Sequence, residues 1–303
     1  MEWLVSHAVA IGSALVAALV AAVGIVVRQV ALQRPAAQDE PSAMVPVLRD
    51  RLWWAGTAAA GAGYAFQAVA LAHGSVLLVQ PLLVSSPLFV LPLSAWRSGQ
   101  RVTGIEWGWA VLLTAALAVF VLVGQPRAGH YRPPVPAWSL ALIGAVVIVV
   151  VCVAVARRTA GRVRASALGA AVAVGLGLIA VLTKTCTHRL RLGGWDALLT
   201  IPAPYLLVAL AVGVTFLQQW AFRSGALQAS VPIMLVGEPI VAVLLGIVVL
   251  GEQLTVRGVG VVALPVALAA MLTATIALGR GEGAHTEEAA KPPSATSKAD
   301  VTS

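Results

Sequence analysis

Nine long apolar runs dominate this sequence and restrict what it can fold into. A helix of about 20 apolar residues spans the hydrocarbon core of a bilayer. The runs lie at residues 4–27, 52–72, 75–96, 107–123, 138–155, 166–183, 202–221, 226–250 and 258–279. Only 11% of the residues are charged, whereas a soluble domain carries about 25%. The sequence therefore excludes a water-soluble globule. It predicts an all-α, polytopic protein with about nine transmembrane helices in a lipid bilayer.

The breaks between the runs divide the chain into two transmembrane halves and a tail. Residues 1–137 hold the first four predicted helices, and residues 138–279 hold the last five. Residues 280–303 are rich in Glu, Lys, Pro, Ser and Thr. A segment of that composition cannot bury a core, so we expect a disordered tail.

The distribution of Lys and Arg predicts the orientation of the chain. With the N-terminus outside, the inner segments carry 14 of these residues and the outer segments carry 6. Cytoplasmic loops of membrane proteins carry the excess of positive charge. We therefore expect a multi-pass plasma-membrane protein with an outer N-terminus and a cytoplasmic C-terminus. The same argument explains the net charge of +8 without nucleic acid as a partner.

An internal repeat relates the second to fourth predicted helices to the seventh to ninth. At an offset of 151 residues, three pairs match: Gln67 with Gln218, Gly74 with Gly225, and Pro81 with Pro232. At an offset of 152, three more match: Pro87 with Pro239, Gly99 with Gly251, and Thr103 with Thr255. The matched helices are five apart, so the two copies enter the membrane in opposite senses. Such inverted-topology repeats are typical of secondary transporters.

Glu238 is the strongest candidate for a functional side chain. It lies near the middle of the eighth run, and Pro239 follows it directly. An ionisable group at that depth is costly and usually faces a cavity or a partner, and a proline frees a backbone carbonyl nearby. We interpret Glu238 as a cation, proton or amine site. The alternative is a structural carboxylate that is hydrogen-bonded between helices.

Further candidates are polar side chains near predicted helix breaks. We expect breaks at Pro81, Pro87, Pro232 and Pro239, because interrupted segments at matching places in two halves point to a transport site. The side chains that we expect to line a cavity are Gln67, Gln80, Ser85 and Gln218. Glutamine can donate and accept hydrogen bonds, although it also joins helices to one another.

The remaining polar residues indicate no cofactor and no metal site. Lys184 closes the sixth run, where we expect it to extend toward the outer interface; binding an anion or pairing with Glu238 are the alternatives. Cys186 and His188 are too few for zinc, which takes four ligands or three and a water. No phosphate-binding loop or catalytic constellation is present, so we do not expect an enzyme.

Two segments resemble the drug/metabolite transporter superfamily. They run from Phe66 to Phe89 and from Gly237 to Thr255. In the EamA-type members a proline begins a helix that ends in a Gly-Glu-x-Leu-Thr turn, which residues 251–255 match. The first-half turn, residues 99–103, has Gln100 in place of the acid. For Glu252 we expect a structural role, either capping a helix or pairing with Arg257.

The resemblance implies ten helices in two inverted five-helix halves, whereas this sequence has nine runs. Nine helices, and the segment that begins at Leu52, are similar to the NIPA-like magnesium transporter branch. We therefore expect a secondary transporter of a small metabolite or drug that works by alternating access and is coupled to protons or another gradient. A magnesium transporter and a non-transporting membrane scaffold are the alternatives. A homodimer is left open.

Overall fold

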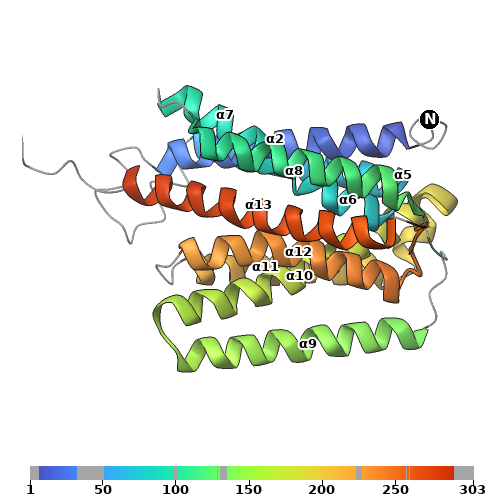
Figure 1. The fold of residues 1–303 in the computed structure, drawn as a ribbon. Coiled ribbons are helices and arrows are strands. Elements are labelled where there is room, and N and C mark those ends of the chain that lie inside the picture. The colour runs from blue at the N-terminus through green and yellow to red at the C-terminus, as the bar shows by residue number, and fades with distance from the viewer. Residues whose placement is uncertain are drawn as a thin grey trace, which may run out of the picture.

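The computed structural model describes residues 7–32, 51–98, 102–127, 129, 135–222, 227–256, 258 and 260–289. These residues form an elongated bundle of helices with one pair of very short strands (Figure 1). The helices are α2 (Ala8–Leu32), α5 (Arg51–His73), α6 (Val76–Leu83), α7 (Ser86–Ser98), α8 (Gly104–Gly124), α9 (Val135–Arg158), α10 (Gly161–Leu199), α11 (Ala203–Phe222), α12 (Leu227–Val248) and α13 (Gly260–Ala289). The strands are β1 (Pro126–Arg127) and β2 (Gln253–Leu254), which pair antiparallel.

The structure confirms a helical fold, and the lengths and apolar composition of its helices are compatible with a multi-pass membrane protein. Within the described residues, eight helical segments are long and apolar enough to cross a bilayer. One of them combines α6 with most of α7, and α5 is not among the eight. The number of nine spans and the inverted repeat therefore stay predictions. Residues 290–303 of the predicted tail lie outside the described part of the chain.

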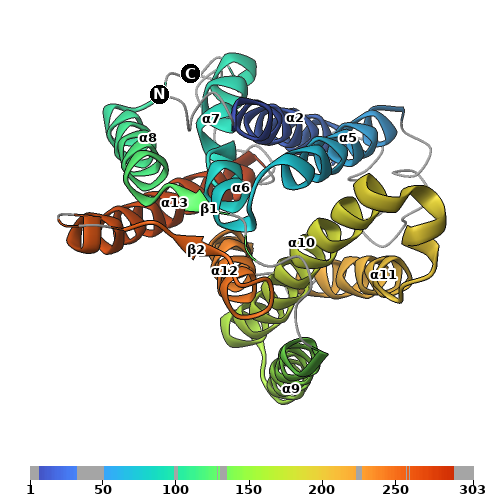
Figure 2. The same ribbon diagram turned by 90° about the vertical axis from the view of Figure 1, so that its right-hand side faces the viewer.

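The two ends of the bundle differ in character, and we name them for what lies there. At the basic face, α9 ends and α10 begins beside Arg157, Arg158, Arg162 and Arg164. At the strand face, α5 ends, α6 begins, and β1 pairs with β2 (Figure 2). The basic face is on the left of Figure 1 and the strand face on the right. The described helices run from one face toward the other (Figure 1), and α6 and α7 meet at a break between the two faces.

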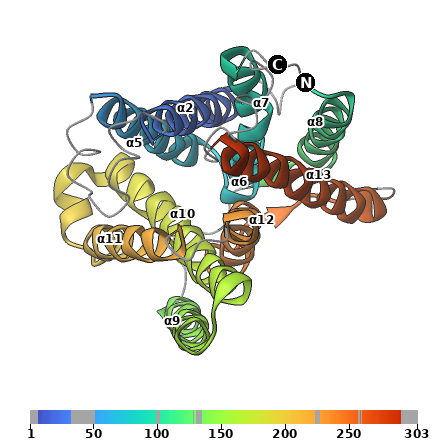
Figure 3. The same cartoon turned by 90° about the vertical axis from the view of Figure 1, so that its left-hand side faces the viewer.

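Helix contacts place α10 and α12 at the centre of the second half. Helix α10 packs against α9, α11 and α12, while α9 stands at the edge of the bundle (Figure 3). In the first half α2 packs against α5, α6 and α7, and α8 packs against α13. The largest buried apolar cluster draws residues from both halves, so the bundle has a shared core.

The third predicted run is broken, as its prolines suggested, but the eighth is not. The break lies at Val84 and Ser85, between α6 and α7, and the Ser85 Oγ donates to the Leu82 carbonyl at 2.6 Å. Pro87 is the second residue of α7, where a missing N–H costs little. Helix α12 continues through both Pro232 and Pro239, and α6 continues through Pro81, so the predicted breaks at these three prolines differ from the structure.

Helix α10 is much longer than the predicted run at residues 166–183. It continues past Lys184 as far as Gly194, whose φ of 67° and ψ of −163° are not helical, and a second short helical segment follows to Leu199. The apolar run ends at Lys184 because polar and basic residues follow it. Those residues interrupt the hydropathy but not the backbone hydrogen bonds, so composition alone placed the end of this helix too early.

Small residues let α10 and α12 approach closely. A Cβ on Gly169 would lie 2.9 Å from the Ser230 carbonyl oxygen, and one on Gly237 would lie 2.6 Å from the Ala173 Cβ. Helices in a membrane associate through such contacts, because lipid offers no hydrophobic driving force between them.

We expect Gly177→Ala to destabilise the bundle. The added Cβ would lie 2.9 Å from the Ala242 backbone nitrogen, and overpacking of this kind costs about 1–3 kcal/mol. The melting temperature of the purified protein should fall. Gly144→Ala on α9 is the matched control, because nothing lies within 4 Å of a Cβ there. Equal melting temperatures for the two variants would contradict the close approach of α10 and α12.

Candidate functional site

The helical backbone is interrupted between α5 and α6, and this interruption is a polar feature of the strand face. Only Gly74 and Ser75 separate the two helices. The Gly74 N–H donates to the Ala70 carbonyl at 2.8 Å, and the Ser75 hydroxyl accepts from the Leu78 N–H at 3.2 Å. The break nevertheless leaves carbonyls at the end of α5 and amides at the start of α6 without helical partners, as every helix end does.

Glu252 caps the start of α6 from the second half of the chain. Its carboxylate accepts from the Val76 N–H and from the Leu77 N–H, both at 2.9 Å. The side chain is 2% exposed. A carboxylate is favoured at a helix N-terminus, where the partial charge is positive. Burial raises the pKa of the Glu252 carboxyl, whereas the two amides and the Lys184 ammonium lower it.

Lys184 and Arg191 of α10 cap the end of α5. The Lys184 ammonium donates to the carbonyls of Leu71 and Gly74, and the Arg191 guanidinium donates to the Ala72 carbonyl. Cations are favoured at a helix C-terminus. Lys184 is only 5% exposed, so the expectation that it extends to the outer interface is wrong. Its ammonium points into the protein because the end of α5 offers it acceptors.

These contacts, which we call the capping network, close the strand face. The network consists of Glu252, Lys184 and Arg191 together with the ends of α5 and α6. Gly246 is part of the same packing: a Cβ there would lie 3.0 Å from the Leu77 Cδ1 and 3.2 Å from the Glu252 Oε2. The end of α12 thus lies against the start of α6, and the two helices run in opposite directions where they meet.

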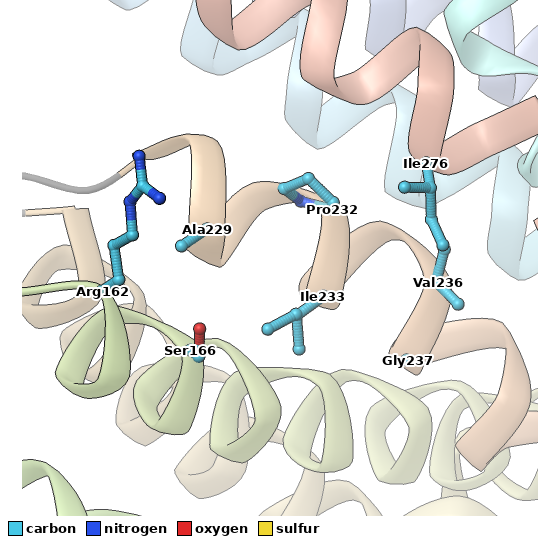
Figure 4. Close-up of a pocket in the computed structure, with 8 residues that line it drawn as sticks. All are labelled: Arg162, Ser166, Ala229, Pro232, Ile233, Val236, Gly237 and Ile276. Carbon is cyan, nitrogen blue, oxygen red and sulfur yellow. The ribbon is translucent and has the colours of Figure 1, made fainter. Parts of the chain in front are cut away.

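A cavity of about 610 Å³ lies at the other end, between α10, α12 and α13. Its wall consists of the residues shown in Figure 4: Arg162, Ser166, Ala229, Pro232, Ile233, Val236, Gly237 and Ile276. Arg162 is exposed, so the cavity reaches the basic face. This cavity therefore lies at the opposite end of the bundle from the capping network.

The structure does not gather the five predicted site residues around this cavity, because none of them is in its wall. Gln67 and Gln80 are buried on α5 and α6, and Gln218 is half-buried on α11. The Ser85 hydroxyl donates a hydrogen bond to the Leu82 carbonyl in the preceding turn. Glu238 is half-buried on α12, next to Gly237 of the cavity wall. The Gln80 Nε2 is buried without a hydrogen-bond partner in the described part of the chain.

The capping network was only partly visible in the sequence. The Gly-Glu-x-Leu-Thr turn pointed to a capping role for Glu252, but not to α6 as the helix it caps. Arg257, the alternative partner, lies outside the described residues. Among the residues that the structure describes, no three His, Cys, Asp or Glu side chains group together as metal ligands.

An uncharacterized protein of Corynebacterium glutamicum is 36% identical to this chain over 277 residues, which cover 91% of the chain and 96% of that protein. No family model matches the chain, and no solved structure matches it significantly. The similarity therefore extends over both transmembrane halves and brings no named activity with it.

We expect Glu252→Ala to lower the melting temperature strongly, because it leaves the buried Val76 and Leu77 amides without an acceptor. An unpaired buried group costs about 1–3 kcal/mol. Glu252→Gln keeps one carbonyl acceptor and should lose less. Gln253→Ala is the control, since that side chain is exposed on the adjacent residue. If Glu252→Ala and Gln253→Ala have the same melting temperature, Glu252 does not stabilise the start of α6.

Proposed function

We propose that this chain, which belongs to the same family as the Corynebacterium glutamicum protein, is a secondary transporter of a small metabolite or drug. It works by alternating access. The observation that carries the proposal is the contrast between the two faces: a cavity opens at the basic face, while the capping network closes the strand face. A transporter needs this asymmetry in each of its end states.

The capping network supplies the gate in this mechanism. Opening the strand face requires Glu252 to leave the amides of α6, and Lys184 to leave the carbonyls at the end of α5. Both side chains belong to the second half and both partners to the first. Rocking one half against the other therefore makes or breaks these contacts together, as alternating access demands.

Helix contacts support the inverted repeat that this motion needs. In the first half α2 contacts α5, α6 and α7; in the second half α10 contacts α11 and α12. The proposed repeat pairs α2 with α10, α5 with α11, and α6 and α7 with α12, so these contacts correspond. The contact between α8 and α13 joins two helices that the repeat pairs with each other.

Glu238 is the coupling residue in this proposal. It is half-buried in the middle of α12, beside the cavity wall. Among the described side chains, none forms a hydrogen bond or ion pair with its carboxylate. An intramembrane acid in such a position is a functional site by default. It would hold a proton or cation in one end state and release it in the other.

The proposed location is the plasma membrane, with the basic face and the C-terminus in the cytoplasm and the N-terminus outside. The four arginines near the junction of α9 and α10 support this orientation through the positive-inside rule. The cavity then faces the cytoplasm. No contact in the described structure favours a magnesium pathway or a non-transporting scaffold over a metabolite transporter.

The gate can be tested before any substrate is known. Leu77 is fully buried next to Glu252. In a protein with Cys152→Ala and Cys186→Ala, we expect Leu77→Cys to react with a membrane-impermeant thiol reagent from the strand face in a fraction of molecules. Glu252→Gln should raise the rate of labelling several-fold, because it weakens the closed state. Gln253→Cys, exposed on the same face, measures access of the reagent. Complete protection of Leu77→Cys in both backgrounds would indicate a static scaffold.

We also expect Glu238→Gln to reduce the pH dependence of this gate. If Glu238 binds the coupling proton, the labelling rate of Leu77→Cys relative to Gln253→Cys should change between acidic and alkaline buffer. The change should be smaller in Glu238→Gln, since the amide does not titrate, and what remains belongs to Glu252 of the gate, whose pKa burial raises. A ratio that varies equally in both proteins would assign the proton to another group.

A further inference from the structure

The cavity at the basic face has a polar end and an apolar end. Arg162 and Ser166 lie one helical turn apart on the same face of α10 and form the polar end (Figure 4). The apolar end consists of Ile233 and Val236 of α12 and Ile276 of α13. Positions 229, 232, 233 and 236 share one face of α12, as the helical period requires. A single ligand could therefore meet both environments at once.

The charge of the cavity wall indicates the sign of the charge on the ligand. Arg162 is the one charged side chain among the described residues that form the wall, and a guanidinium stays protonated in proteins. No hydrogen bond or ion pair from a described residue occupies it. In Figure 4 the guanidinium extends toward the start of α12, away from the Ser166 hydroxyl, and a guanidinium suits a carboxylate or phosphate, whose oxygens accept from it. Arg162 would repel the charge of a cationic ligand.

The size of the cavity limits the body of the ligand. Its volume of about 610 Å³ lies within the range of about 300–1,000 Å³ that is usual for small-molecule sites. Such a space holds a metabolite-sized molecule but not both acyl chains of a phospholipid. Branched aliphatic side chains in the wall favour a hydrocarbon or aromatic body, because removing apolar surface from water lowers the free energy.

We propose that this cavity binds a small amphipathic anion. Its carboxylate or phosphate is held by Arg162, and its apolar body extends past Ser166 to lie against Ile233, Val236 and Ile276. This inference names the substrate class of the proposed transporter and rests on that proposal. Glu238 is outside the wall, so the group proposed for coupling is separate from the group proposed for the substrate.

Binding to three probes that share one carbon skeleton tests the charge requirement. The probes are 3-phenylpropionate, 3-phenylpropylamine and 3-phenyl-1-propanol, added to the full chain in nanodiscs of zwitterionic lipid. A ligand that binds the folded state raises its melting temperature by mass action. We expect the carboxylate to raise it in a saturable way, and the amine and alcohol to have little effect. Equal shifts with all three probes would overturn the proposal.

Two variants locate the binding. Arg162→Gln should weaken 3-phenylpropionate binding by about tenfold or more, as loss of a charge-assisted hydrogen bond predicts. Arg158→Gln, at the end of α9 and outside the wall, should leave binding unchanged. Val236→Phe should block the apolar end without changing any charge. Unaltered binding in Arg162→Gln, or an equal Arg162-dependent shift on adding phosphatidylglycerol alone, would overturn a site for a small soluble anion.

The outcome is independent of the test of transport. Selective binding of 3-phenylpropionate without strand-face labelling of Leu77→Cys would keep the anion site and refute the transporter. Labelling of Leu77→Cys without selective binding of the carboxylate would keep the transporter and refute this substrate class.

Discussion

Backbone groups that lose their helical partners inside the bundle determine how this protein is held together. In a bilayer no water satisfies such groups, and each one left unpaired costs several kcal/mol. The break between α5 and α6 creates a set of them at one point. Glu252 and Lys184 satisfy that set from positions 176 and 113 residues away in sequence from their respective partners Val76 and Leu71. The first half thus cannot complete its own break, and the two halves stabilise each other through charge-assisted hydrogen bonds rather than through lipid-like packing alone.

The apolar runs were sufficient to predict where helices form, because membrane insertion depends on the composition of a segment of about 20 residues. They were not sufficient to predict what Lys184 does. A lysine at the end of an apolar run looks the same whether its ammonium reaches the interface or a buried carbonyl. The acceptors of Lys184 exist only because a different segment breaks at Gly74 and Ser75. The sequence alone shows Lys184 and the residues Gly74 and Ser75, but it does not show that the Lys184 ammonium contacts this break.

Prolines illustrate the same limit from the other side. Pro87 follows a break, whereas Pro232 and Pro239 lie in a continuous helix. The difference lies in the surroundings. At Ser85 both the backbone N–H and the hydroxyl donate to the Leu82 carbonyl, so this acceptor keeps partners where the chain leaves the helix. Helix α12 instead lies along the small residues of α10, where Gly169 and Gly177 bring the two backbones together. Local sequence does not reveal that contact.

The capping network also changes how the charges of this chain should be counted. The six Lys and Arg residues assigned to the outer side include Lys184 and Arg191. Both are engaged with the end of α5, so their role is fixed by folding. The arginines near the junction of α9 and α10 differ in this respect, because Arg157, Arg158 and Arg162 are exposed at the basic face. The positive-inside rule acts on charges in loops during insertion. The count that bears on orientation therefore keeps both cations, at 14 inner to 6 outer residues, whereas the charge of the folded strand face has to be counted with both engaged as helix caps. The count of 14 to 6 supports the proposed orientation, in which the cavity opens to the cytoplasm and the capping network lies on the outer side.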